Sequence, residues 1–197
     1  ACSTTKMSFI EQVQQKFDKG EQFYEAGKYT RAKDELQYVV MNNPGSQIAL
    51  DARYLLGESH FKLKEYEDAA IEFDKFARFA QSYDKAELAR FRICECAIKM
   101  SNSFQKDQKN TLEAIDRLQE FIEDYPTSTN VDVATKEISL LRLKLAKKEF
   151  ESARLYLKLE EYDSALIYLN NVLTQYYDTE IVDEVRLTIV FHYLLQN

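Results

Sequence analysis

One ordered pattern of small, aromatic and large apolar residues recurs along the chain, and it constrains the fold more than any other feature. In each full copy a small residue lies twelve positions before an alanine, and a large apolar residue lies four positions after that alanine. The first copy consists of Gly20, Phe23, Ala32, Leu36 and a closing Pro44. The second has Gly57, His60, Ala69 and Phe73, and another has Ala153, Tyr156, Ala165 and Leu169.

This order and spacing are typical of a tetratricopeptide repeat, in which two antiparallel helices form one unit. The small residue and the alanine let the two helices approach closely, and the large apolar side chain fills the space between repeats. A weaker copy contains Thr111, Ala114, Leu118 and Pro126. The sequence therefore predicts an all-α fold, a right-handed tetratricopeptide superhelix (an α-solenoid) of about four and a half repeats.

The scarcity of turn residues favours the same fold class. The 197 residues include only 4 Gly and 2 Pro, too few for the frequent turns of a many-stranded β protein. Apolar positions recur at helical spacing without a breaker from Val131 to Leu159, which predicts one long helix. The polar stretch 101–110 predicts a loop insertion in the third repeat. The expected helices are 6–26, 28–42, 47–63, 65–81, 84–102, 109–124, 131–159, 161–176 and 179–196.

The predicted organisation is a short tether, 1–5, followed by one solenoid over 6–197. Asp84 and either Thr129 or Asn130 are candidate helix N-caps, because short polar side chains accept hydrogen bonds from the first free backbone amides. The predicted repeats are 6–45, 46–82, 83–127, 128–178 and a partial repeat over 179–197.

Several functional classes find no support in the residues. The net charge of -7 does not favour binding to nucleic acid, which needs a clustered basic surface. No run of eighteen apolar residues is present, as a membrane-spanning helix would need. Cys94 and Cys96 are expected to be small buried residues, and His60 a satisfied, partly buried histidine, without a metal site. We expect neither catalytic residues nor a cofactor, so the chain is predicted not to be an enzyme.

The first helices of the first two repeats offer a candidate peptide groove. Their positions facing away from the second-helix alanine combine aromatic rings with carboxylates, which suits an extended peptide rich in apolar side chains. The alternative is that the same side chains pack against the neighbouring repeat. The candidate groove residues are Phe17, Glu21, Tyr24, Tyr54, Glu58 and Phe61.

The end of the chain offers a second candidate surface. The last helix has no partner helix after it, so we expect it to expose Val185, Ile189 and Leu194 unless something covers them. An open solenoid end of this kind can be buried by a partner domain. The candidate partner interface consists of Tyr176, Tyr177, Asp178, Arg186 and Ile189.

The N-terminus carries a candidate lipidation site. A bacterial lipoprotein signal ends in a small residue followed by the cysteine that becomes lipidated, and Ala1-Cys2 matches that ending. The alternative is an ordinary cysteine near the start of the chain.

Residues 121–180 carry a more specific signature than the repeat spacing. It includes Tyr125-Pro126-Thr127-Ser128, Leu141-Arg142-Leu143-Lys144-Leu145-Ala146 and a closing Asp178-Thr179. With the N-terminal cysteine and the insertion in the third repeat, nearly the whole chain resembles the BamD family, lipoproteins of the machinery that assembles β-barrel proteins in the outer membrane. Tyr177 departs from the family pattern, which usually has proline there.

The resemblance implies a role, a location and partners. Cys2 would carry the lipid that anchors the protein at the periplasmic face of the outer membrane of a Gram-negative bacterium. The C-terminal repeats would bind the periplasmic domain of the central barrel assembly protein nearest its barrel. The N-terminal repeats would contact unfolded outer-membrane proteins and other assembly lipoproteins. The alternative function is a generic periplasmic tetratricopeptide adaptor lipoprotein that recruits a cell-envelope or division partner, and the long helix 131–159 favours the first.

Overall fold

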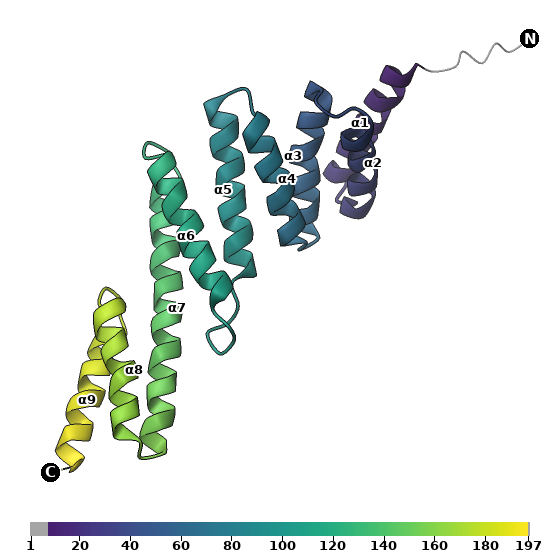
Figure 1. Cartoon of the computed structure of the whole chain (residues 1–197). Helices are drawn as coiled ribbons and strands as arrows, with labels where there is room; N and C mark the ends of the chain where they lie inside the picture. Colours follow the sequence, from purple (N-terminus) through teal and green to yellow (C-terminus); the bar gives the residue numbers. More distant parts are fainter. Residues whose placement is uncertain (1–7, 197) are drawn as a thin grey trace, which may run out of the picture. The chain divides into compact units, whose positions relative to one another are not determined.

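The computed structural model describes residues 8–196, with side chains to Tyr193. Over these residues the chain forms helices and loops and no strand (Figure 1). The all-α fold of tetratricopeptide type is therefore confirmed. The helices are α1 (Phe9–Glu25), α2 (Tyr29–Asn42), α3 (Gln47–Lys62), α4 (Tyr66–Phe79), α5 (Tyr83–Met100), α6 (Lys109–Asp124), α7 (Val131–Lys158), α8 (Tyr162–Gln175) and α9 (Val182–Gln196).

The chain divides into two compact units, and the boundary between them in the sequence falls between Lys99 and Met100. The division falls inside the predicted third repeat, 83–127, so its first helix lies in unit 1 and its second in unit 2. We describe each unit by itself. The single solenoid over 6–197 and the tether over 1–5 stay predictions.

In unit 1 the helices pair as the repeat pattern predicts: α1 packs against α2, α3 against α4, and α2 against α3. The glycines mark the closest approaches. A Cβ atom added at Gly20 would lie 2.7 Å from the side chain of Leu36, and one at Gly57 would lie 2.9 Å from the ring of Phe73. Both large side chains are fully buried. The predicted role of the small residues is thus confirmed in the first two repeats.

The turns within the first, second and fourth repeats share one backbone feature. Gly27, Lys64 and Glu160 all have positive φ, with values of 71°, 64° and 62°. Each lies two residues before the tyrosine that begins the second helix of its repeat. Only the first repeat places glycine there, although a residue with a Cβ atom adopts the left-handed conformation at a cost. The short turn brings the end of the first helix close to the start of the second.

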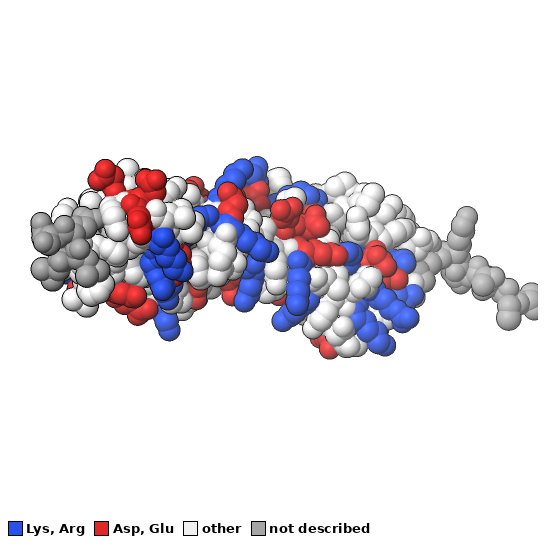
Figure 2. Space-filling view, turned by 90° about the horizontal axis from the view of Figure 1, so that it is seen from below, with Lys and Arg blue, Asp and Glu red and all other residues white. Residues whose placement is uncertain are grey.

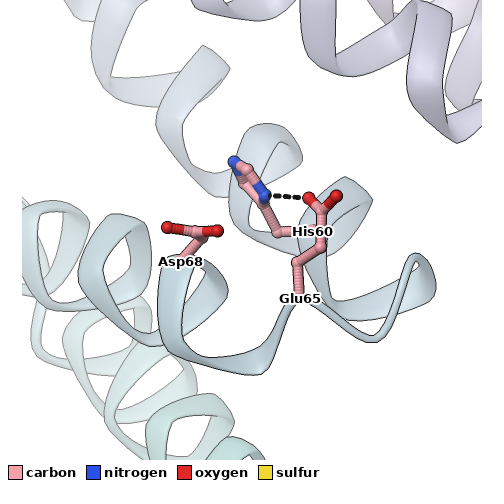
Figure 3. Close-up of side chains that lie close together, drawn as sticks. All are labelled: His60, Glu65 and Asp68. Carbon is pink, nitrogen blue, oxygen red and sulfur yellow. Dashed lines mark hydrogen bonds and ion pairs between the residues drawn. The ribbon is translucent and has the colours of Figure 1, made fainter.

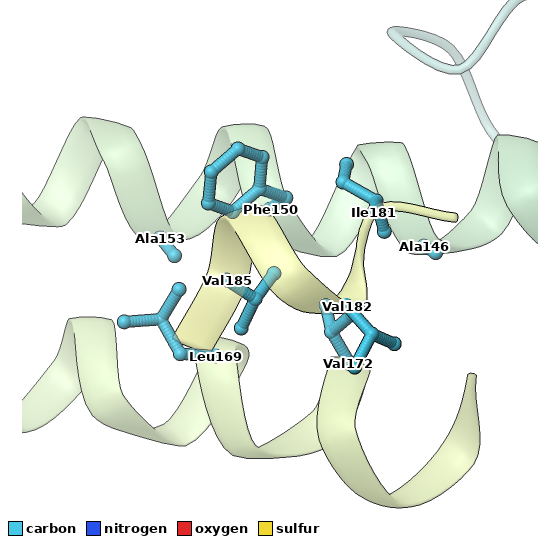
Figure 4. Packing of buried hydrophobic residues seen from close by; sticks show 8 residues of the cluster. All are labelled: Ala146, Phe150, Ala153, Leu169, Val172, Ile181, Val182 and Val185. Carbon is cyan, nitrogen blue, oxygen red and sulfur yellow. The ribbon is translucent and has the colours of Figure 1, made fainter. Parts of the chain in front are cut away.

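Unit 2 is organised around α7, whose 28 residues give a length of about 42 Å at 1.5 Å per residue. This helix packs against both α6 and α8, and the long helix predicted over 131–159 is confirmed. Figure 4 shows the apolar cluster that α7, α8 and α9 share. Its buried members are Ala146, Phe150, Ala153, Leu169, Val172, Ile181, Val182 and Val185.

The last helix corrects one expectation. Val185 was expected to be exposed, but it is fully buried, and Ile189 packs against the same cluster. Leu194 lies beyond the side chains that the structure describes. Large apolar residues are exposed on the opposite side of α9 instead, at Leu187 and Phe191 among others. The helix has apolar residues on two sides. The side that carries Val182 and Val185 packs against α7 and α8.

The helix ends explain the small differences from the predicted bounds. α1 begins at Phe9 because Ser8 and Glu11 form a reciprocal capping box. Asp84 lies inside the first turn of α5 and not at its cap, since Ser82 Oγ accepts from the Lys85 amide at 3.3 Å. Asn130 holds the N-cap position of α7 but makes no capping bond through its side chain. None of the described helices has the length and apolarity needed to cross a membrane.

Candidate binding surfaces

The first helices of successive repeats in unit 1 present equivalent positions to one side. Glu21 in α1, Glu58 in α3 and Glu95 in α5 are each 37 positions apart, and Phe17 and Tyr54 keep the same interval. We call this surface the A-helix wall. It comprises the six residues predicted for the peptide groove together with Arg92 and Glu95 of α5.

A charged network joins the three helices of the A-helix wall. Arg92 donates from Nε to Glu58 Oε1 at 2.6 Å and from a terminal nitrogen to Glu58 Oε2 at 2.9 Å. It also donates to Glu95, and the Tyr24 hydroxyl donates to Glu58 at 3.4 Å. The Glu58 and Arg92 side chains are only 12% and 15% exposed. Glu58 is therefore held by partners on both neighbouring helices.

The aromatic residues of the wall are half-buried by contacts within their own repeats and with the next repeat. The ring of Tyr54 lies 5.6 Å from that of Phe73 and 5.2 Å from that of Phe76, between centroids. The Arg92 guanidinium lies 4.1 Å from the centroid of Phe61, a cation–π contact. Tyr54 thus packs within its own repeat, whereas Phe61 also contacts Arg92 of the next repeat. The alternative interpretation, packing against the neighbouring repeat, therefore describes part of the set. Among the six predicted groove residues only Glu21 is exposed, and peptide binding by the set stays a prediction.

Burial and charge shift the ionisation of this wall. Burial, with the nearby Glu58 carboxylate, raises the pKa of Tyr54 to about 12. The same two causes raise the pKa of Tyr24. Burial lowers the pKa of the Arg92 guanidinium, but Glu58 and Glu95 outweigh it and the net shift is upward. At neutral pH the wall thus presents neutral hydroxyls around a charged Arg92.

The predicted partner interface in unit 2 is organised by a residue that sequence reasoning did not select. Arg142 of α7 donates from Nε to Asp178 Oδ2 at 2.9 Å and from a terminal nitrogen to Asp178 Oδ1 at 2.7 Å. It also donates to the carbonyl of Gln175 at 2.7 Å and lies over the ring of Tyr176. The hydrogen bond from Arg142 lowers the pKa of Asp178. These hydrogen bonds from Arg142 hold the turn between α8 and α9 in place.

The remaining interface residues differ in how far they are exposed. Tyr177 is 71% exposed, and Arg186 forms an ion pair at 3.1 Å with Asp183 of its own helix. Ile189 points into the core cluster. The free apolar area is the α9 outer face, which we define as Leu187, Val190 and Phe191, exposed by 71%, 54% and 61%. Their i, i+3, i+4 spacing is the sequence signal that could have identified them.

Charges on the face shown in Figure 2 are mixed, with acidic and basic side chains interspersed.

Two of the cysteines, Cys94 and Cys96, are buried as predicted. Burial raises the pKa of the Cys96 thiol to about 12, so this sulfur is neither a ready nucleophile nor a ready metal ligand. Cys2, the predicted lipidation site, lies outside the described residues.

Comparison with known proteins places the chain in a family. The model of the YfiO family, described as outer membrane lipoprotein, matches residues 11–196. The match spans both units and both candidate surfaces. No curated protein matches the chain.

Proposed function

Because this chain belongs to the YfiO family of outer membrane lipoproteins, we propose that it is a BamD-like, non-enzymatic scaffold of the machinery that assembles β-barrel proteins in the outer membrane. The family match over residues 11–196 carries the proposal. Stacked helix pairs support it, because repeat folds expose long surfaces on which other polypeptides bind.

Helix α7 favours this function over a generic periplasmic adaptor. An ordinary tetratricopeptide repeat has a period of about 34 residues, and no helix in it approaches the 28 residues of α7. In this chain α7 packs against two helices, α6 and α8. An adaptor built from regular repeats has no need for such a helix.

The C-terminal surface is proposed to bind the periplasmic domain of the central barrel assembly protein. It combines the α9 outer face with the exposed Tyr177 and Arg186. Apolar side chains beside polar ones are typical of the centre and rim of a protein interface. Asp178 contributes to this surface indirectly, because its ion pair with Arg142 holds the turn that carries Tyr177.

Co-purification with that periplasmic domain tests the assignment. The double variant Leu187→Ser, Phe191→Ser removes two apolar side chains that are exposed, so the fold should remain and the complex should be lost. Leu155→Ser in α7 is the matched control, because Leu155 is 55% exposed and does not belong to the α9 outer face. Equal recovery of the partner with the double variant and the control would reject this surface.

The A-helix wall is proposed to contact unfolded outer-membrane proteins. Alanine at Tyr54 is a poor test, because that ring packs on Phe73 and Phe76 and its loss would destabilise the repeat. Glu21→Arg changes the exposed member of the predicted set. We expect it to alter binding of a barrel-strand peptide without changing the melting temperature, and Asp34→Arg on α2 is the control. Unchanged peptide affinity would argue against the wall.

The proposed anchor is a lipid on Cys2. In cells that express the natural precursor, Cys2→Ser should release the protein from the membrane fraction, whereas Cys94→Ser should not. Membrane association of both variants would contradict lipid anchoring through Cys2.

A further inference from the structure

Three ligand-type side chains meet at the turn of the second repeat. His60 lies in the last turn of α3, Glu65 holds the N-cap position of α4, and Asp68 lies in the first turn of α4. The left-handed Lys64 reverses the chain tightly enough to bring them together. Figure 3 shows the carboxylates of Glu65 and Asp68 on opposite sides of the imidazole.

The repeat fold itself does not require these residues. The equivalent positions in the first repeat hold Phe23, Lys28 and Arg31, whose guanidinium lies 5.8 Å from the Phe23 ring centroid. The fourth repeat holds Tyr156, Glu161 and Ser164. An aromatic ring therefore satisfies the packing at the histidine position, and the combination of histidine with two carboxylates occurs in the second repeat alone of these three.

The distances suit a metal ion. One nitrogen of His60 and one oxygen from each of Glu65 and Asp68 all lie within 4.8 Å of one another. With such separations there is a point no more than about 2.8 Å from all three atoms, and side-chain rotation closes the remaining gap to the roughly 2.0–2.2 Å of zinc–nitrogen and zinc–oxygen bonds. His60 Nδ1 and Glu65 Oε2 lie 2.6 Å apart as a hydrogen-bonded pair, and a bound ion would replace the proton between them.

A basic side chain now occupies part of this position. Lys33 Nζ lies 2.9 Å from both carboxylate oxygens of Glu65. The Lys33 ammonium would have to move aside for an ion, and it is on a flexible stem.

The surroundings supply room for water ligands. His60, Asp68 and Lys33 line a cavity of about 620 Å³, which is large enough to hold several water molecules. A zinc ion bound by three protein side chains keeps a fourth position for water or an incoming ligand.

We propose that His60, Glu65 and Asp68 bind a divalent transition-metal ion, Zn²⁺ being the best match to one imidazole and two carboxylates. This inference departs from the sequence-based expectation of no metal site. It is independent of the proposed assembly role, because the three residues lie outside both the A-helix wall and the C-terminal surface.

Calorimetric titration of ZnCl₂ into the full chain tests the site. We expect one site of one-to-one stoichiometry. Asp68→Asn should weaken it by roughly tenfold or more, and Asp68 is exposed, so the fold is not at risk. Glu67→Gln, which changes the neighbouring exposed carboxylate, is the matched control and should bind as the unmodified chain does. His192→Gln and Cys2→Ser should also retain the site.

Lys33→Met gives a test in the opposite direction. Removal of the competing ammonium should tighten zinc binding roughly fivefold, as the loss of a partly exposed ion pair suggests. A protein that merely loses a structural contact would not gain affinity. The proposal is overturned if the full chain gives no binding heat, if Asp68→Asn and Glu67→Gln bind equally, or if Cys2→Ser abolishes binding.

Discussion

Gly20 and Gly57 set how closely the helices of the first two repeats approach. We predict that Gly57→Ala lowers the free energy of unfolding by about 1–3 kcal/mol, because the new methyl group overlaps the buried Phe73 ring. Urea denaturation measures the change. Ser139→Ala, at an exposed position of α7, is the control for helix propensity. Equal stability of the two variants would mean that Phe73 moves aside without cost.

The left-handed turns make a second prediction at single residues. Lys64→Gly and Glu160→Gly should each raise the free energy of unfolding by about 1 kcal/mol, because glycine adopts positive φ without steric cost. Gly27→Ala should lower it, and since a Cβ atom there meets nothing within 4 Å, the loss would report backbone conformation alone. Denaturant midpoints measure all three, and a stabilising Gly27→Ala would contradict the argument.

The raised pKa of Tyr54 predicts a pH dependence. Its hydroxyl ionises near pH 10 in the unfolded chain but only near 12 in the folded one, so the folded state holds the proton more tightly. Its contribution to stability is complete below pH 10 and is lost as the pH rises from about 10 to about 12. Tyr54→Phe should remove this part of the decline in urea midpoint, while Tyr83→Phe, at an exposed ring, should leave it unchanged.

Spacing was enough to predict the glycine contacts, because Gly57 and Phe73 belong to a motif that repeats in order. It was not enough to predict the partners of Arg92 and Arg142. Each reaches across to another helix, and the choice of carboxylate depends on how far the helices have already approached. The interval of 37 residues does carry Glu58 to Glu95, so a closer comparison of the first helices would have extended the A-helix wall into α5.

At the scale of elements, Arg92 attaches α5 to α3. Arg92→Leu leaves the Glu58 carboxylate largely buried without its main partner, so we expect a loss of about 3 kcal/mol. Arg90→Leu on the same helix is the control. The ion pair of Arg90 with Asp74 is more exposed, with side chains 36% and 29% accessible. Its loss should lower the free energy of unfolding by less than about 1 kcal/mol. Equal losses would show that burial does not separate the two pairs.

Element existence was predictable and the packing face of α9 was not. All of the predicted helices are present within a few residues of their expected ends, because long apolar periodicity without breakers is a strong signal. Helix α9 carries apolar residues on two sides, at Val185 and at Val190. Its own sequence offers no polar face to orient it, and contacts with α7 and α8 decide which side is buried.

At the scale of the whole molecule, each unit has its own apolar clusters. Unit 1 buries one cluster around Leu36 and another around Phe73, which α5 completes through Ala89, Ile93 and Cys96. We predict that a fragment of residues 1–99 folds and melts cooperatively by circular dichroism. A fragment of residues 1–82, which lacks α5, should melt at a lower temperature. An unfolded 1–99 fragment would show that its clusters do not suffice.

The double pairing of α7 has a kinetic consequence for unit 2. Because α6 and α8 both pack against the uninterrupted helix α7, neither can separate without exposing part of the buried surface of α7 to water. Amide protons near Leu145, in the middle of α7, should therefore exchange with deuterium only when the entire unit opens. Those near Phe191 and Tyr193 in α9, whose side chains are exposed, should exchange by local fraying.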